Sequence, residues 1–184
     1  STEGSAVYNF QYANPTRICF GEGQIARLPE LIPAGSRLLV LYGGGSIKQN
    51  GVYEQLTQAL AGREWLEFPG IGANPQYDQL MEAVALVKRE RIDFLLAVGG
   101  GSVVDGTKFV AAAACFEGDD PWEILRDKAS IKGALPLGCV LTLPATGSES
   151  NPAAVVSRGE AKLSFYNPLV QPVFAVLDPA TTYS

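Results

Sequence analysis

The tetrapeptide Gly-Gly-Gly-Ser occurs twice in this chain, at residues 43–46 and 99–102. Each copy directly follows a short apolar run, and glycine lets the backbone approach a ligand with no Cβ in the way. Helix N-terminal amides beyond Gly101 favour an anion, so a dinucleotide pyrophosphate is the expected ligand. Neither the G-x-G-x-x-G fingerprint nor the P-loop occurs. The alternative is that the glycines only allow tight strand-to-helix turns. Two copies of the motif favour this alternative less than a single copy would.

A third loop, LTLPATGSESN at residues 141–151, is dense in small polar side chains. Its hydroxyl and amide groups belong to Thr142, Thr146, Ser148 and Asn151. Such groups hydrogen-bond phosphates and amides without adding charge. Asp105 and Lys108 follow the second glycine loop at helical spacing. The third loop is therefore a second candidate binding segment, the alternative being an ordinary capping loop.

The sequence contains no histidine. This excludes a Ser-His-Asp or Cys-His arrangement, an imidazole acid or base and a His-ligated metal site within these residues. We therefore assign no catalytic residue and no metal ligand to the chain, and expect its loops to bind and position a cofactor.

The apolar pattern predicts the elements that position these loops. Continuous apolar runs at residues 37–42 and 93–98 indicate buried strands, and helical patterns follow at residues 51–60 and 103–116. Apolar strands alternating with helices predict a doubly wound, mostly parallel Rossmann-like α/β sheet with helices on both faces. In such sheets ligands bind beyond the carboxyl ends of the strands, where the glycine loops lie.

The remaining elements are shorter. Further strands are predicted at residues 65–68, 138–143 and 173–177, and a helix at residues 75–91 that starts near Pro75. Residues 153–157 and 162–165 predict a hairpin, and residues 17–20 an early strand that pairs outside the parallel core.

No composition shift marks a linker, so we expect residues 1–184 to form one dinucleotide-binding domain, with residues 1–7 as a flexible tail. Asp178 and Pro179 follow the last strand without a closing helix, which suggests that further chain follows. No secretory signal is recognisable in residues 1–10, and no apolar run approaches the ~20 residues that cross a bilayer. We expect a cytoplasmic protein that does not bind membranes.

Composition excludes other classes of partner. With a net charge of -5, no basic stripe for nucleic acid is expected.

Cys19, Cys115 and Cys139 are odd in number and flanked by apolar residues, which favours buried free thiols in a reducing compartment over a redox or metal role.

Six segments together resemble the iron-containing alcohol dehydrogenase family: ICFGEGQI, YGGGSIK, FPGIGANP, LAVGGGSVVDGTKF, TLPATGSESN and PVFAVLDPA. The likeness is greatest to its NADP-dependent butanol dehydrogenase-like or aldehyde reductase branch, and runs from about Tyr8 to Tyr183. It implies a dehydroquinate synthase-like N-terminal cofactor domain. The family's all-helical domain, which holds iron or zinc with one Asp and three His, would be absent from this chain.

The resemblance also implies roles for individual residues. Cofactor contacts are expected from Gly43, Gly44, Gly45, Ser46, Asn74, Gly100, Gly101, Ser102, Asp105, Thr142, Thr146, Ser148, Asn151 and Lys162. For Asn74 a structural helix cap is an equal alternative, and for Asp105 an early-helix residue favoured by the helix dipole. The hairpin that carries Lys162 is shorter than in the family.

Relatives that use NAD tend to carry an Asp in the first glycine loop, whose carboxylate would repel a 2′-phosphate. Gly45 and Ser46 stand here instead, so NADP is favoured over NAD. The complete enzyme would transfer hydride between NADPH and an aldehyde or alcohol at a metal, and dimerisation is common in the family. Alternatives are a glycerol dehydrogenase-like or dehydroquinate synthase-like enzyme, or a free-standing nucleotide-binding module.

Overall fold

The computed structural model describes residues 15–142 and 147–179. Among these, six parallel strands form one sheet in the order β1-β8-β5-β4-β2-β3. The strands are β1 (Arg17–Phe20), β2 (Leu38–Tyr42), β3 (Trp65–Phe68), β4 (Phe94–Gly99), β5 (Leu137–Leu141) and β8 (Phe174–Leu177). Every residue of β2, β4 and β5 is buried, because apolar side chains on both faces of these central strands are covered.

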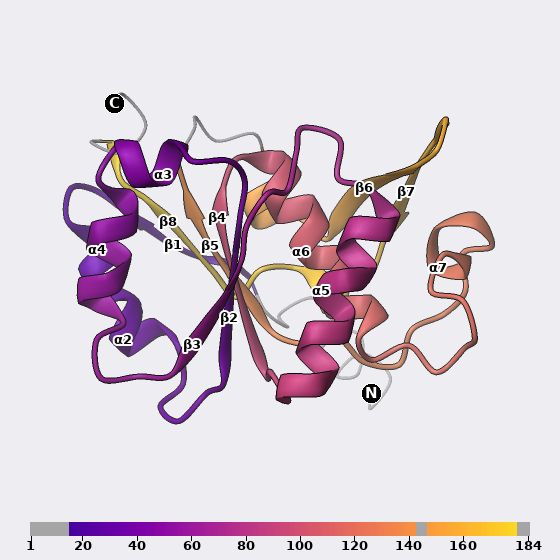
Figure 1. Ribbon diagram of the computed structural model, residues 1–184, viewed down its shortest axis with the longest axis horizontal. Coiled ribbons are helices and arrows are strands. Elements are labelled where there is room, and N and C mark those ends of the chain that lie inside the picture. The colour runs from indigo at the N-terminus through magenta and orange to yellow at the C-terminus, as the bar shows by residue number, and fades with distance from the viewer. Residues whose placement is uncertain (1–14, 143–146, 180–184) are drawn as a thin grey trace, which may run out of the picture.

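Helices cover both faces of the sheet, which Figure 1 shows nearly edge-on. One face carries η1 (Gln24–Arg27), α2 (Leu28–Leu31), α3 (Ser46–Gln49) and α4 (Val52–Ala59), and the other carries α5 (Tyr77–Glu90) and α6 (Gly101–Ala113). Two clusters of buried apolar side chains result, one on each face. This arrangement confirms the predicted doubly wound class.

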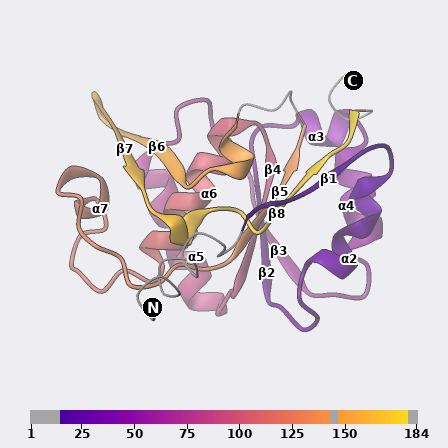
Figure 2. The same ribbon diagram turned by 180° about the vertical axis from the view of Figure 1, so that it is seen from behind.

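The predicted hairpin is present as β6 (Ala153–Arg158) and β7 (Ala161–Tyr166), which pair antiparallel apart from the main sheet. It packs against α6, and Figure 2 shows it from behind. The short elements α7 (Glu123–Arg126), η2 (Ser148–Ser150) and η3 (Pro168–Val170) complete the described part of the chain. β6 and β7 become part of the site described below.

Two local predictions were wrong. Residues 17–20 do not pair outside the parallel core: β1 lies parallel to β8 at the edge of the main sheet, with Ile18 opposite Ala175. Only Cys19 of this strand is buried, whereas Ile18 is 50% exposed, so β1 lacks the continuous burial of the central strands. The helix predicted to start near Pro75 begins at Tyr77, and its N-cap is Gln76 in an extended conformation.

Cys19 and Cys139 are buried free thiols as predicted, whereas Cys115 is only partly buried. Burial raises the pKa of the Cys139 thiol to about 12. Across residues 15–142 and 147–179, no helix combines the length and apolarity needed to cross a membrane.

Gly138 in β5 gives a test of the packing on one sheet face. The Phe174 ring stacks on Phe94, with centroids 6.0 Å apart, and lies where a Cβ on Gly138 would be, closer than real Cβ contacts allow. Both rings are buried, so the G138A variant should lose about 1–3 kcal/mol of unfolding free energy. Urea unfolding measures this loss. The G133A variant is the control, because open space surrounds that glycine; equal stability of the two variants would contradict the packing described.

Candidate functional site

The carboxyl ends of β2, β4 and β5 meet at one edge of the sheet, because these strands are parallel. The first glycine loop follows β2, the second follows β4 and the third loop follows β5. In Figure 1 this edge lies at the top of the sheet, beside α3. The three loops singled out by sequence therefore lie along the same edge.

A sharp turn at Gly99 leads from β4 into α6. Gly99 has φ 153°, and a Cβ there would lie 2.9 Å from Val103 Cγ2, so a larger residue would be strained and crowded. Gly100 is the N-cap of α6, and its carbonyl accepts hydrogen bonds from the amides of Val103 and Val104. The first turn of α6 holds no acidic residue, which leaves the positive end of the helix dipole available to an anion.

A pocket of about 410 Å³ opens beside the start of α6. The start of α6, the segment before α5, the third loop and the hairpin form its walls. Its lining residues are Ala73, Asn74, Pro75, Gly101, Ser102, Asp105, Ser148, Asn151, Val155, Ser157 and Lys162. Seven of the fourteen residues predicted from the sequence are thus brought together: Asn74, Gly101, Ser102, Asp105, Ser148, Asn151 and Lys162.

Asp105 joins two walls of this pocket. Its Oδ1 accepts a hydrogen bond from Ser148 Oγ at 2.5 Å, and its Oδ2 accepts one from the Val155 amide at 3.1 Å. Asp105 lies beyond the first turn of α6, so the alternative of an early-helix residue favoured by the dipole is not supported. Its carboxylate thus links α6 to the third loop and to β6.

Lys108 lies one turn further along α6 and is fully buried. Its Nζ donates three hydrogen bonds, to Ser148 O at 2.6 Å, Asn151 Oδ1 at 3.0 Å and Ala153 O at 2.8 Å. Burial lowers the pKa of this ammonium to about 8, against the opposing effect of the Asp105 carboxylate. Lys108 therefore ties the third loop and the start of β6 to α6. Its helical spacing from Asp105 was visible in the sequence, but its acceptors were not.

Further hydrogen bonds fix the loops to each other. Ser102 Oγ donates to Ala73 O at 2.7 Å, which links the second glycine loop to the segment before α5. The Thr142 amide donates to Gly99 O at 3.1 Å, and this mostly buried residue lies outside the pocket lining. Asn74 lines the pocket without capping α5.

The first glycine loop stands apart from the pocket lining. Gly43 O accepts a hydrogen bond from the Gly70 amide, Gly45 is the N-cap of α3, and Gly44, Gly45 and Ser46 are exposed. Gly100 is likewise not in the lining, although it precedes two residues that are. Thr146 lies outside the described residues.

Four lining residues stand outside the fourteen predicted contacts: Ala73, Pro75, Val155 and Ser157. For Ser157 a signal existed, because the predicted hairpin places it directly opposite Lys162. Ala73 and Pro75 flank Asn74, and only the fold shows that their segment reaches α6.

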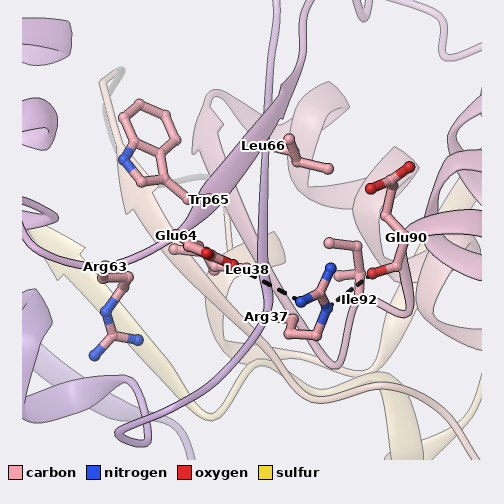
Figure 3. A pocket seen from close by; sticks show the side chains of 8 residues that line it. All are labelled: Arg37, Leu38, Arg63, Glu64, Trp65, Leu66, Glu90 and Ile92. Carbon is pink, nitrogen blue, oxygen red and sulfur yellow. Dashed lines mark hydrogen bonds and ion pairs between the residues drawn. The ribbon is translucent and has the colours of Figure 1, made fainter.

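A second hollow, of about 370 Å³, lies at the opposite end of the sheet, where β2 and β3 begin. Figure 3 shows Arg37 there directed at Glu64 and Glu90. Arg37 Nε donates to Glu90 O at 2.9 Å, at the negative carboxyl end of the α5 dipole. The charge of Arg37 is thus already paired. This hollow is therefore a weaker candidate for a phosphate site than the carboxyl edge of the sheet.

Comparison with known proteins identifies the family. The model of the iron-containing alcohol dehydrogenase family matches residues 15–179. The chain belongs to this family. The NADPH-dependent aldehyde reductase YqhD of Escherichia coli is 58% identical over 180 residues, covering 96% of this chain and 46% of that protein. The probable NADH-dependent butanol dehydrogenase 1 of Bacillus subtilis is 48% identical, covering 97% of this chain and 47% of that protein.

Solved structures of family members share the fold. A crystal structure of E. coli YqhD superposes with a TM-score of 0.90 at 58% identity, over 93% of this chain and 45% of that one. The NADH-dependent butanol dehydrogenase A of Thermotoga maritima gives 0.88 at 43% identity, over 94% of this chain and 45% of that one. The chain spans about half the length of the curated relatives it matches and corresponds to their N-terminal half.

The family is named for iron, so we tested the described residues for a metal site. Within residues 15–142 and 147–179, no group of three or more His, Cys, Asp or Glu side chains could hold a metal ion. Asp105, the carboxylate in the pocket, is engaged by Ser148 and Val155. These residues do not fit a metal centre, and we derive no chemical step through one.

Lys108 should give folding stability a distinctive pH dependence. The pKa of its ammonium is about 8 in the folded chain and near 10.5 when unfolded, so between these values the unfolded chain holds a proton that the folded chain has lost. Raising the pH through this window therefore favours folding, by at most about 1.4 kcal/mol per pH unit. The unfolding free energy of the unaltered chain minus that of K108M should rise from pH 8 to 9.5 in urea titrations. Parallel curves would refute this, and K132M, which removes an exposed lysine, is the control.

Proposed function

We propose that this chain binds a nicotinamide dinucleotide, with NADPH preferred over NADH, in the pocket beside the start of α6. We further propose that residues 1–184 form one cofactor domain of a metal-dependent alcohol dehydrogenase or aldehyde reductase. The observation that carries this is the pocket itself, because the second glycine loop, the third loop and the hairpin converge there on the N-terminus of α6.

The pyrophosphate belongs at the N-terminus of α6, where Gly100, Gly101 and Ser102 present backbone amides and the positive end of the helix dipole. Lys162 supplies the cationic side chain of the pocket lining and suits a phosphate or ribose. Uncharged polar side chains of the lining suit the ribose and the nicotinamide amide, and they include those of Asn74, Ser148 and Asn151. Thr142 and Thr146 remain expected contacts by resemblance to the family.

The adenosine ribose belongs at the first glycine loop, where Gly43 and Gly44 allow close approach. The absence of a carboxylate at Gly45 and Ser46 supports NADPH, since nothing there would repel the 2′-phosphate. Relatives differ in this respect: the E. coli protein is named for NADPH and the B. subtilis protein for NADH.

When bound, the nicotinamide supplies a hydride, and this chain supplies binding, orientation and exclusion of water along one side of the cofactor. The aldehyde or alcohol substrate and an iron or zinc ion belong to the half of the family's length that this chain does not span. Turnover by this chain alone should be negligible. A cytoplasmic location and a homodimer are part of the same proposal, the former supported by three free thiols.

The test is calorimetric titration with NADPH and NADH of the unaltered chain and of G45D. Gly45 is the N-cap of α3 with open space around it, so an Asp fits without strain and adds a carboxylate near the proposed 2′-phosphate. We expect the unaltered chain to prefer NADPH, and G45D to weaken NADPH about tenfold or more while sparing NADH.

G45N is the matched comparison, because it adds the same bulk without the charge, so the difference between the two variants reports the carboxylate alone. Binding of neither nucleotide by the unaltered chain would overturn the proposed function. Equal weakening of NADPH and NADH by G45D would overturn the placement of the 2′-phosphate.

A further inference from the structure

The two faces of the β6–β7 hairpin have different surroundings. Ser157 and Lys162 stand directly opposite each other and both line the pocket. Because successive side chains of a strand point to opposite faces, Arg158 lies on the other face, as does the buried Val156. Arg158 is the last residue of β6 on this face before the turn. Arg158 is therefore placed to hold Ser157 and Lys162 in position at the pocket.

Arg158 binds three groups that all lie outside the hairpin. Its guanidinium carbon is 4.3 Å from the centroid of the Tyr77 ring and 5.6 Å from that of Trp122. Its Nη1 is 3.7 Å from Asp120 Oδ2. Both aromatic contacts have cation–π geometry, and the carboxylate adds an ion pair. The hairpin is outside the main sheet, and its end is joined to the segment before α5 by one backbone hydrogen bond, from the Ser157 amide to Pro75 O at 2.9 Å. The Arg158 contacts add a side-chain attachment to that single link.

Asp120 connects this anchor to the opposite wall of the pocket. Its Oδ1 accepts hydrogen bonds from the Tyr77 hydroxyl at 2.7 Å and from the Trp122 amide at 3.0 Å. The Tyr77 hydroxyl, followed by the Trp122 amide, keeps the pKa of Asp120 below its usual range, so the carboxylate stays charged at neutral pH. Tyr77 is the first residue of α5, and residues 73–75 just before it line the pocket. The Asp120 carboxylate thus contacts both Tyr77, at the start of α5, and Arg158, at the end of β6.

We propose that Arg158 and Asp120, neither of which lines the pocket, are positioning residues that keep Ser157 and Lys162 at the separation from residues 73–75 that NADPH binding requires. This inference rests on the proposed function and extends it to residues that do not touch the cofactor. Without the anchor, the Lys162 end of the hairpin gains freedom that binding must remove, and the ordering cost weakens affinity.

The first measurement is the dissociation constant for NADPH of the unaltered chain, R158A and D120A, by titration calorimetry. Both substitutions should raise it about 3- to 10-fold, the cost of ordering roughly one or two mobile side chains. R89A is the matched control, because Arg89 is an exposed arginine at the far end of α5, paired with its neighbour Glu90. It should bind as the unaltered chain does.

The second measurement separates positioning from general stability. If Arg158 acts through Lys162, then R158A in a K162A background should change the dissociation constant less than twofold beyond K162A alone. A purely structural role predicts independent, additive losses that follow the fall in melting temperature. R158K and D120N, which keep side-chain size, take the place of the alanine variants if those do not fold, and should show smaller losses in the same direction.

Each result of these titrations either supports or overturns the positioning role of Arg158 and Asp120. Unchanged NADPH affinity in the Arg158 and Asp120 variants would overturn the inference while leaving the proposed function intact. Additivity with K162A would also overturn it. Failure of the unaltered chain to bind NADPH would overturn the proposed function and this inference with it.

Discussion

A single ammonium group, that of Lys108, holds together the parts of the molecule that form the site. Its three acceptors belong to the third loop and to the first residue of β6, and all three distances are 3.0 Å or less. Lys108 lies on α6, the helix that begins at the pocket. This helix therefore supplies both the N-terminus that favours an anion and the side chain that holds the third loop and β6 in place. The site depends on this junction more than on any one residue in its lining.

A buried charge is costly unless its hydrogen bonds are satisfied. Lys108 is fully buried, so its place in the core requires residues 148–153 to be folded over it. The reverse also holds, since Ser148 and Ala153 direct backbone carbonyls at the ammonium. The third loop and α6 therefore stabilise each other, and Asp105 strengthens this coupling from one turn earlier through Ser148 and Val155.

The sequence predicted what depends on short-range pattern. Continuous apolar runs and the glycines after them located β2, β4 and the start of α6, because a buried parallel strand is apolar on both faces. Contacts between distant residues could not be predicted in this way. Thr16, beside β1, bonds to Pro172 across 156 positions, and Asp105 meets Ser148 across 43, so spacing alone identifies neither partner. The resemblance to the family supplied residue roles, but not the bonds that join them.

The same limit applies to the hairpin. Its strands were predictable from local pattern, whereas Arg158 reads as an ordinary charged residue near a turn. Only the fold brings it to Tyr77 and to Asp120, which lies in the segment between α6 and α7. A side chain whose partners come from two segments far from it in the chain has no sequence signature of its own.

The bonds around the pocket form a closed circuit. Ser102 of α6 bonds to residues 73–75, which bond to Ser157 of the hairpin; Val155 of the hairpin then bonds back to Asp105 of α6. A rim closed by bonds within the chain is set before any ligand arrives, so binding a flexible dinucleotide need not also order the protein around it. The contacts that shape the pocket proposed for the cofactor therefore lie within this chain.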